Sequence, residues 1–458
     1  MTNILFSSLT FAESIDSNQG VAVVVNGERV YTDTPAEIRN DRTLVPVRGI
    51  FEKMGADVQW DESTQKVSVS YKTKTIKLQI GNTTAVINNV AAKMDVAPVI
   101  SNNRTLIPLR FISENIGMLV RWAPETRMAF ITDPAYEGVL PEKTVLGFTT
   151  NDYKGDNFSY NSLAENYGSI DSIATFSYGF DENGNIQMTG ESQAATVDLA
   201  NKKGIKPLVL IHNYVGGQFN RDVSHQVLSD KAKRTKLINS ILDVTTREGY
   251  EGVNIDIENV YWYDRQNYTD FIKELKQQMA ARGYLTTLSI PAKDGDYATN
   301  SWNGAFDYVQ LGQYADQILL MTYDEHYFGG EAGPIASLPW VERVMQYASQ
   351  TIPSQKVLLG IGGYGYDWSS QGSRALPFSG IEELLASKNI IPSWDAASKS
   401  PYFTYYQDGI RHEVWYENAQ SISIKTDLVI KYGLGGIGLW KLGYDNSELW
   451  DVINEKIG

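Results

Sequence analysis

Eight short apolar runs, alternating with helix-like stretches, constrain the fold of this 458-residue chain more than any other feature. Amphipathic patterns with helical spacing lie between them, among others at 231–248, 268–282 and 338–350. Eight strands that alternate with helices over about 310 residues predict an α/β fold, the parallel (β/α)8 or TIM barrel, within 144–458. Catalytic groups of such barrels lie at the carboxyl ends of the strands. The runs are 145–148, 172–176, 207–211, 252–258, 285–290, 317–321, 356–361 and 436–440.

The fourth run carries an alternation of apolar and polar side chains. Asn254, Asp256 and Glu258 lie between valine and isoleucine residues, so a strand would place the three polar groups on one face. A half-exposed surface strand would explain the alternation, but strands disfavour Asn, Asp and Glu on their solvent side. The barrel pattern in the rest of the chain therefore predicts that these groups point into the barrel and rise toward its open end.

An internal repeat precedes the barrel. Residues 40–48 recur as 102–110 with an offset of 62 residues, and the same offset aligns Trp60 with Trp122. Each unit reads as a strand, a turn, a short helix with an apolar face, and a strand pair around the tryptophan. We expect the two units to pack as one separate N-terminal α+β domain over residues 21–134.

The repeat resembles the domain family named after the N-terminal domain of copper amine oxidases, through the paired Arg-Thr-Leu-(Val/Ile)-Pro-(Val/Leu)-Arg segments. The resemblance implies a stalk or attachment module. The chain has no cysteine, and all four histidines lie outside this region, so the repeat has no imidazole or thiolate for copper. We therefore expect no metal site and no cofactor. The histidines are His212, His225, His326 and His412.

The net charge and the amino-acid composition limit the classes of partner and of site that this chain can have. The formal net charge is −14, whereas a nucleic-acid partner requires clustered Lys and Arg, so we expect no nucleic acid. The absence of cysteine excludes disulfides, zinc–thiolate sites and a cysteine nucleophile. No run is long enough for a membrane span. Residues 1–20 read as a signal-peptide remnant or a disordered tail, and Pro134 and Pro141 suggest a linker over 135–143. We expect a secreted or cell-wall-associated or spore-associated bacterial monomer.

The stretch between the seventh and eighth predicted strands is long. Residues 393–416 within it are aromatic and strand-like, which predicts a small α+β insertion at about 375–425. Two interpretations stay open at this point. The insertion either covers part of the substrate cleft or packs elsewhere on the barrel without touching ligand.

Two carboxylates on one face of the fourth strand suit glycoside hydrolysis. Such a reaction needs an acid that protonates the leaving oxygen and a second group that stabilises the positive sugar carbon. Asp256 and Glu258 are two residues apart, roughly 6–7 Å along a strand, and a like charge nearby raises a carboxyl pKa. Glu258, nearer the barrel mouth, is the expected acid, and Asp256 is placed to orient a substrate group.

Motifs on three of the predicted strands resemble family 18 glycoside hydrolases. Residues 251–258 resemble that family's Asp-x-x-Asp-x-Asp-x-Glu motif, 321–324 its sixth-strand Met-x-Tyr-Asp, and 438–440 its eighth-strand tryptophan. Residues 363–368 and 414–417 also resemble the bacterial subgroup of spore-cortex and cell-wall N-acetylglucosaminidases. The resemblance covers about 144–458.

The resemblance implies a retaining mechanism in which the substrate's own 2-acetamido oxygen attacks the anomeric carbon. Glu258 would then be the general acid and base, and Asp256 would hold the acetamido N–H. Tyr323 would contact the acetamido oxygen, Asp324 would help to orient the distorted sugar, and Trp440 would form the apolar floor beneath it.

Further substrate contacts are expected from Asn254, Met321, Tyr364 and Trp415. The sequence departs from the family pattern at Glu251 and at Asn254, where the family motif has aspartates. An asparagine cannot share a proton with Asp256, but its amide can donate to that carboxylate.

Three functions remain open. The first is an N-acetylglucosaminidase that acts on peptidoglycan or spore cortex, which the wall-type motifs and Asn254 favour. The second is a chitinase. The third is a sugar-binding wall protein that does not cleave, and the presence of Asp256, Glu258 and Tyr323 argues against it.

Overall fold

The computed structural model describes residues 21–25, 28–30, 32, 34–40, 42–123, 128–133 and 143–457. The chain divides into two compact units, with the boundary between residues 137 and 138. The predicted tail over 1–20 and the predicted linker, apart from Lys143, lie outside the described residues.

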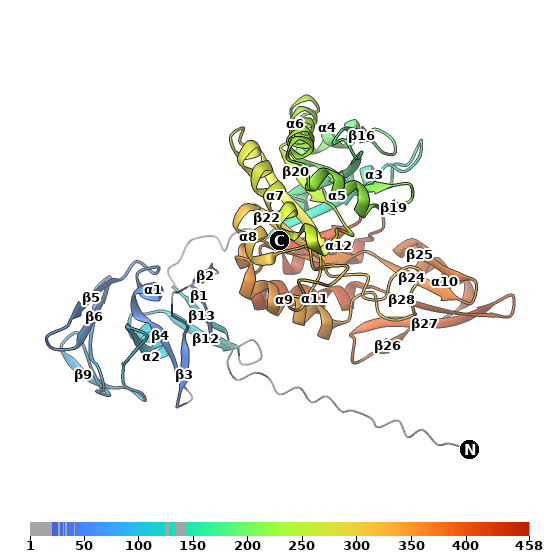
Figure 1. The fold of residues 1–458 in the computed structure, drawn as a ribbon. Helices are drawn as coiled ribbons and strands as arrows, with labels where there is room; N and C mark the ends of the chain where they lie inside the picture. The colour runs from blue at the N-terminus through green and yellow to red at the C-terminus, as the bar shows by residue number, and fades with distance from the viewer. Residues whose placement is uncertain are drawn as a thin grey trace, which may run out of the picture. The chain divides into compact units, whose positions relative to one another are not determined.

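The N-terminal unit contains two copies of one strand–helix–strand-pair arrangement, as the repeat predicts (Figure 1). Strands β4 and β11 pair antiparallel, and Val45 lies opposite Ile107, its own equivalent 62 residues later. The pairing of these two strands is thus symmetric about Val45 and Ile107. The elements are β1 (Ala22–Val25), β2 (Glu28–Val30), β3 (Glu37–Arg39), β4 (Arg42–Pro46), α1 (Val47–Phe51), β5 (Asp57–Asp61), β6 (Lys66–Tyr71), β7 (Lys74–Gln79), β8 (Thr84–Ile87), β9 (Val90–Lys93), β10 (Val99–Ser101), β11 (Arg104–Pro108), α2 (Leu109–Asn115), β12 (Leu119–Ala123) and β13 (Met128–Thr132).

A single core joins both copies of the repeat. Ile50 and Phe51 of α1 lie in the same buried cluster as Leu109 and Ile112 of α2. Trp60 and Trp122, the two tryptophans that the offset aligns, pack against this cluster from equivalent strands. Burial of one shared apolar core explains why the two copies of the repeat form one domain.

The second unit is a closed barrel of eight parallel strands, which confirms the predicted fold. Strand β14 pairs with both β15 and β29, so the sheet has no open edge among the eight. The strands follow one another around the barrel in chain order, and β16 (Ile186–Met188) extends β15 as an antiparallel hairpin outside it. The barrel strands are β14 (Thr144–Thr149), β15 (Ser172–Phe180), β17 (Lys206–His212), β20 (Gly252–Asp256), β21 (Leu285–Pro291), β22 (Gln317–Met321), β23 (Val357–Gly362) and β29 (Gly436–Trp440).

Helices pack on the outside of the barrel (Figure 1). Many of their apolar residues are buried. In α6, for example, Leu237, Ile238, Ile241 and Leu242 are buried, with the spacing of one helical face. The helices are α3 (Phe158–Asn166), α4 (Ala194–Lys203), α5 (Arg221–Leu228), α6 (Lys231–Arg247), α7 (Arg265–Ala280), α8 (Tyr308–Tyr314), α9 (Leu338–Thr351), α11 (Ala419–Tyr432) and α12 (Ser447–Lys456).

Strand β20 is shorter than the run that predicts it. The regular strand ends at Asp256, where His212 of β17 is its last partner, and Glu258 lies two residues beyond this point. The backbones of β17 and β20 separate there, so Glu258 stands at the mouth of the barrel and not within the strand.

The predicted insertion between β23 and β29 is an antiparallel five-stranded sheet with one helix, in the order β25-β24-β28-β27-β26. This sheet runs from Tyr364 to Tyr416, so it starts and ends before the predicted limits of 375 and 425. It starts directly after β23 because the chain continues at Tyr364 as β24, which lies between β25 and β28 in this sheet. The elements are β24 (Tyr364–Ser369), β25 (Gly372–Pro377), α10 (Phe378–Lys388), β26 (Ser393–Asp395), β27 (Ser400–Gln407) and β28 (Ile410–Tyr416).

Candidate active site

Asp256 and Glu258 lie together at the carboxyl end of β20. Asp256 is 5% exposed, and its Oδ1 has no hydrogen-bond partner among the described residues. Burial raises the pKa of Asp256 to about 7. Burial, with the charges of Asp256 and Asp324, raises the pKa of Glu258 well above its usual value. The pair therefore retains a proton at neutral pH, which suits Glu258 for donating that proton to a leaving group.

Asn254 is held inside the barrel by β21. Its Nδ2 donates to Thr287 Oγ1 at 3.0 Å, and its Oδ1 accepts from Ser289 Oγ at 2.9 Å. Asn254 has no exposed surface. Its observed bonds therefore lead to β21 and not to Asp256, and they keep a neutral polar group directly below the two carboxylates.

Asp324 is held by the first strand of the insertion. Tyr364 and Tyr366 of β24 both donate to Asp324 Oδ1, at 2.5 and 2.9 Å. Partial desolvation raises the pKa of Asp324, and these two hydroxyls oppose the shift because they stabilise the charged form. Asp324 has a left-handed backbone, with φ of 59°. This conformation is rare for a residue with a side chain and is common at functional sites.

Tyr323 precedes Asp324 and faces the same group of residues. Burial raises its pKa, and the charges of Asp256, Asp324 and Glu258 add to the shift. Its hydroxyl therefore stays protonated and available as a donor. The ring of Tyr323 meets that of Tyr364 edge-on, with 6.3 Å between centroids.

Trp440 lies at the end of β29 within an apolar cluster. Its ring centroid lies 5.6 Å from that of Phe148 on β14 and 6.0 Å from that of Phe176 on β15. Met321, at the end of β22, packs in the same cluster. Apolar side chains from four barrel strands thus pack together around Trp440.

Trp415 joins the insertion to this site. With Tyr323 and Trp440 it packs against a buried cluster that contains Tyr364 and Trp368. Its ring also stacks on Tyr402, with 4.6 Å between centroids. The insertion therefore supplies side chains to the region around Asp324, which favours the first of the two interpretations left open for it.

Two residues that take part in this arrangement were not predicted from the sequence. Tyr366 lies in the stretch that resembles wall-lytic enzymes, but nothing in the sequence shows that its hydroxyl reaches Asp324. Asn213 directly follows β17. Its side-chain amide accepts a hydrogen bond from the backbone N–H of Glu258 and donates one to the backbone carbonyl of the same residue. Its position after a barrel strand was the only available signal.

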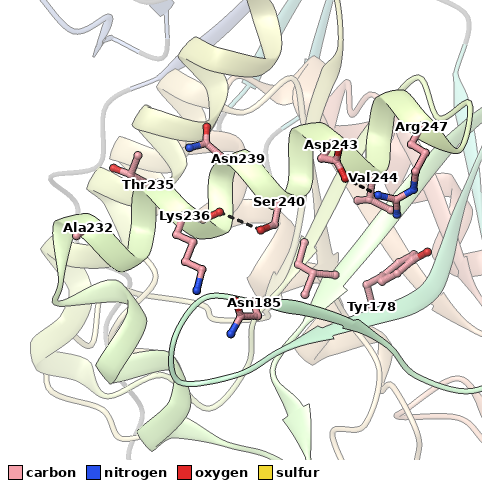
Figure 2. A pocket seen from close by; sticks show the side chains of 11 residues that line it. Tyr178, Asn185, Ala232, Thr235, Lys236, Asn239, Ser240, Asp243, Val244 and Arg247 are labelled. Carbon is pink, nitrogen blue, oxygen red and sulfur yellow. Dashed lines mark hydrogen bonds and ion pairs between the residues drawn. The ribbon is translucent and has the colours of Figure 1, made fainter.

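A separate hollow of about 660 Å³ lies between α6 and the β15–β16 hairpin (Figure 2). Figure 2 shows Lys236 beside Asn185, and Arg247 beside Asp243 and Tyr178. None of the residues proposed from the sequence lines it. Its lining contains no pair of buried carboxylates, so it does not have the chemistry of the site at the strand ends.

Metal sites and membrane spans are both absent from the part of the chain that the structure describes. There, no group of three or more His, Asp or Glu side chains is arranged to hold a metal ion. None of the described helices is both long and apolar enough to cross a bilayer.

Comparison with known proteins agrees with both parts of the fold. Residues 24–131 match the copper amine oxidase N-terminal domain, and residues 141–445 match glycosyl hydrolases family 18. A Bacillus subtilis protein described as the uncharacterized glycosylase YvbX is 32% identical over 320 residues, covering 69% of this chain and 92% of the relative.

Solved structures that resemble this chain include two crystal structures of bacterial enzymes. One is the Bacillus cereus spore cortex-lytic enzyme SleL, with a TM-score of 0.65 and 26% identity, covering 69% of this chain and 74% of that one. The other is a Chromobacterium violaceum chitinase, with a TM-score of 0.65 and 28% identity, covering 69% of this chain and 99% of that one. With a closed barrel, carboxylates at the end of its fourth strand and a family match over residues 141–445, the chain belongs to glycosyl hydrolase family 18 and is a glycosidase.

Proposed function

We propose that the protein cleaves β-1,4 bonds after N-acetylglucosamine in peptidoglycan or spore cortex, by substrate-assisted retaining catalysis. One observation carries this proposal: the buried Oδ1 of Asp256, which has no hydrogen-bond partner among the described residues, lies beside a glutamate with a raised pKa. A buried carboxylate oxygen without a partner is costly unless a ligand supplies a donor. The N–H of a 2-acetamido group is such a donor.

In the first step the acetamido carbonyl oxygen attacks the anomeric carbon as the bond to the leaving oxygen breaks. Glu258 gives its proton to that oxygen, so the aglycone leaves as a neutral alcohol. Asp256 accepts a hydrogen bond from the acetamido N–H and stabilises the positive oxazolinium ring. Tyr323 donates to the acetamido oxygen and orients it, while Trp440 supports the apolar face of the sugar.

In the second step Glu258, now a carboxylate, takes a proton from water. The hydroxide attacks the anomeric carbon on the face that the aglycone left, which opens the oxazolinium ring and restores the β configuration. Two inversions at one carbon give net retention, and no enzyme nucleophile is needed. Asp324, held by Tyr364 and Tyr366, helps to orient the distorted sugar.

The mechanism is tested with a thiazoline analogue of N-acetylglucosamine, which resembles the cyclic intermediate. We expect competitive inhibition, and NMR should detect the β-anomer as the first product. The α-anomer as the first product would exclude the retaining mechanism.

The substrate is tested by mass spectrometry of the products from cortex, vegetative wall and chitin oligomers. We expect muropeptides or cortex fragments that end in N-acetylglucosamine. A chitinase is the second candidate, because the similar Chromobacterium structure is of a chitinase. Faster cleavage of chitin than of both wall polymers would favour it. A wall or cortex substrate implies a secreted, wall-associated or spore-associated protein.

A further inference from the structure

Asn213 continues the pairing of two barrel strands beyond the point where their backbones separate. The last backbone pair between β17 and β20 is His212 with Asp256. Past this pair, Asn213 Oδ1 accepts the backbone N–H of Glu258 at 2.9 Å, and Asn213 Nδ2 donates to the backbone carbonyl of Glu258 at 2.8 Å. The side-chain amide thus replaces a peptide group and satisfies both backbone groups of one residue.

The amide is itself fixed on its other side. Asn213 has no exposed surface, and its Nδ2 also donates to Ser224 Oγ at 2.8 Å and to the carbonyl of Asn220 at 3.2 Å. The backbone of Asn220 in turn donates to the carbonyl of Asn213 at 2.9 Å. The start of α5 and the end of β17 therefore hold the amide in one orientation.

The two hydrogen bonds from Asn213 matter because the chain turns sharply after Glu258. Asn259 has a left-handed backbone with φ of 52°, and its side chain bonds to the carbonyl of Phe219 and to Arg221. A residue between the end of a strand and such a turn has no regular ladder to set its φ and ψ. Those two angles decide where the carboxyl group of Glu258 points.

We infer that Asn213 is a positioning residue that sets the direction of the general acid through the backbone of Glu258. This inference rests on the proposed function, since it assigns Asn213 a part in the reaction that Glu258 performs. A misplacement of about 1 Å at a reacting group costs about 10²-fold in rate. Because Asn213 acts on the acid and not on sugar binding, its loss should lower kcat and leave KM within about threefold.

Two substitutions separate positioning from packing. Asn213→Leu has nearly the same shape and removes both bonds to Glu258, so kcat should fall by about 10²-fold. Asn213→Asp keeps an acceptor for the N–H but, when ionised, turns a carboxylate toward the Glu258 carbonyl. Once protonated, the same acid donates to that carbonyl again. Its kcat relative to wild type should therefore recover as the pH falls from 8 to 5, whereas that of Asn213→Leu should not.

The matched control is Thr245→Val, which removes one buried hydrogen bond, from Thr245 Oγ1 to the carbonyl of Ile241 within α6. It should lower the thermal midpoint and leave kcat unchanged. Each variant is assayed on the polymer that the wild-type protein hydrolyses. Circular dichroism is used to check that each variant folds. Folded Asn213→Leu with kcat within threefold of wild type would overturn the inference. If that variant does not fold, a pH-independent ratio for Asn213→Asp would overturn it. Wild type that cleaves no polymer would count against the proposed function itself.

Discussion

Replacement of Asp256 by asparagine should stabilise the folded barrel at alkaline pH, because the native site holds this carboxyl in a form that resists ionisation. Burial raises the pKa of Asp256 from 3.8 to about 7. The folded state therefore binds this proton more tightly than the unfolded state does. Stability from this group is fully present below the unfolded pKa and is lost as the pH rises toward 7.

The size of the effect follows from the shift. About three pKa units at 1.36 kcal/mol each correspond to about 4 kcal/mol lost between pH 4 and pH 8. The side-chain amide of the Asp256→Asn variant cannot ionise, so this variant should gain about 3–4 kcal/mol relative to wild type across that interval. A constant cost of about 1–3 kcal/mol for a buried unpaired amide shifts the whole curve without changing its slope.

The assay is urea unfolding followed by tryptophan fluorescence at several pH values. Eight of the ten tryptophans follow residue 143, so the larger fluorescence change reports the barrel. An equal difference in unfolding free energy between variant and wild type at pH 5 and at pH 8 would refute this prediction.

Asp181→Asn is a control, because folding lowers the pKa of Asp181 whereas it raises that of Asp256. Burial alone would raise the pKa of Asp181, but the hydrogen bonds that it accepts from Asn185 and Asn183 outweigh burial and lower the pKa. Native Asp181 therefore contributes stability above its unfolded pKa, and this is lost as the pH falls through the folded pKa. The substitution should destabilise at neutral pH and have less effect in acid.

Three further predictions concern catalysis. Glu258→Gln should fold normally and lose about 10²–10⁴-fold in turnover, because the general acid is gone; turnover within threefold of wild type would refute its role. Tyr364→Phe and Tyr366→Phe each remove one hydrogen-bond donor to Asp324, so each should raise the pKa of Asp324. Each should also lower kcat on soluble oligosaccharide by about tenfold. A truncated chain that starts at Lys143 should hydrolyse oligosaccharides at a nearly unchanged rate and release less from insoluble wall. An inactive truncation would show that the repeat completes the site.

Local patterns in the sequence identify much of the fold. Parallel strands buried on both faces read as apolar runs, and all eight runs coincide with barrel strands. The repeat likewise predicts the short helices α1 and α2 in the N-terminal unit, because an offset of 62 residues preserves their apolar faces. Asp256 and Glu258 could be assigned to one site because side chains two residues apart share a face.

The limits of each element were less predictable. The alternation suggests a strand to Glu258, whereas pairing with β17 stops at Asp256. The insertion begins at Tyr364, where the sequence alone shows only an aromatic stretch. A strand ends where its partner's backbone leaves it, and the partner is distant in the sequence.

Contacts between distant segments were decided only by the tertiary structure. Asn213 reaches Glu258 across 45 residues, and Tyr366 reaches Asp324 across 42. Asn254 bonds to β21, although its own sequence neighbourhood suggested Asp256 as the partner. A sequence pattern records which residues share a strand face or a helix face. Closure of the barrel determines which faces meet, because hydrogen bonds require distances near 3 Å that only the assembled strands provide.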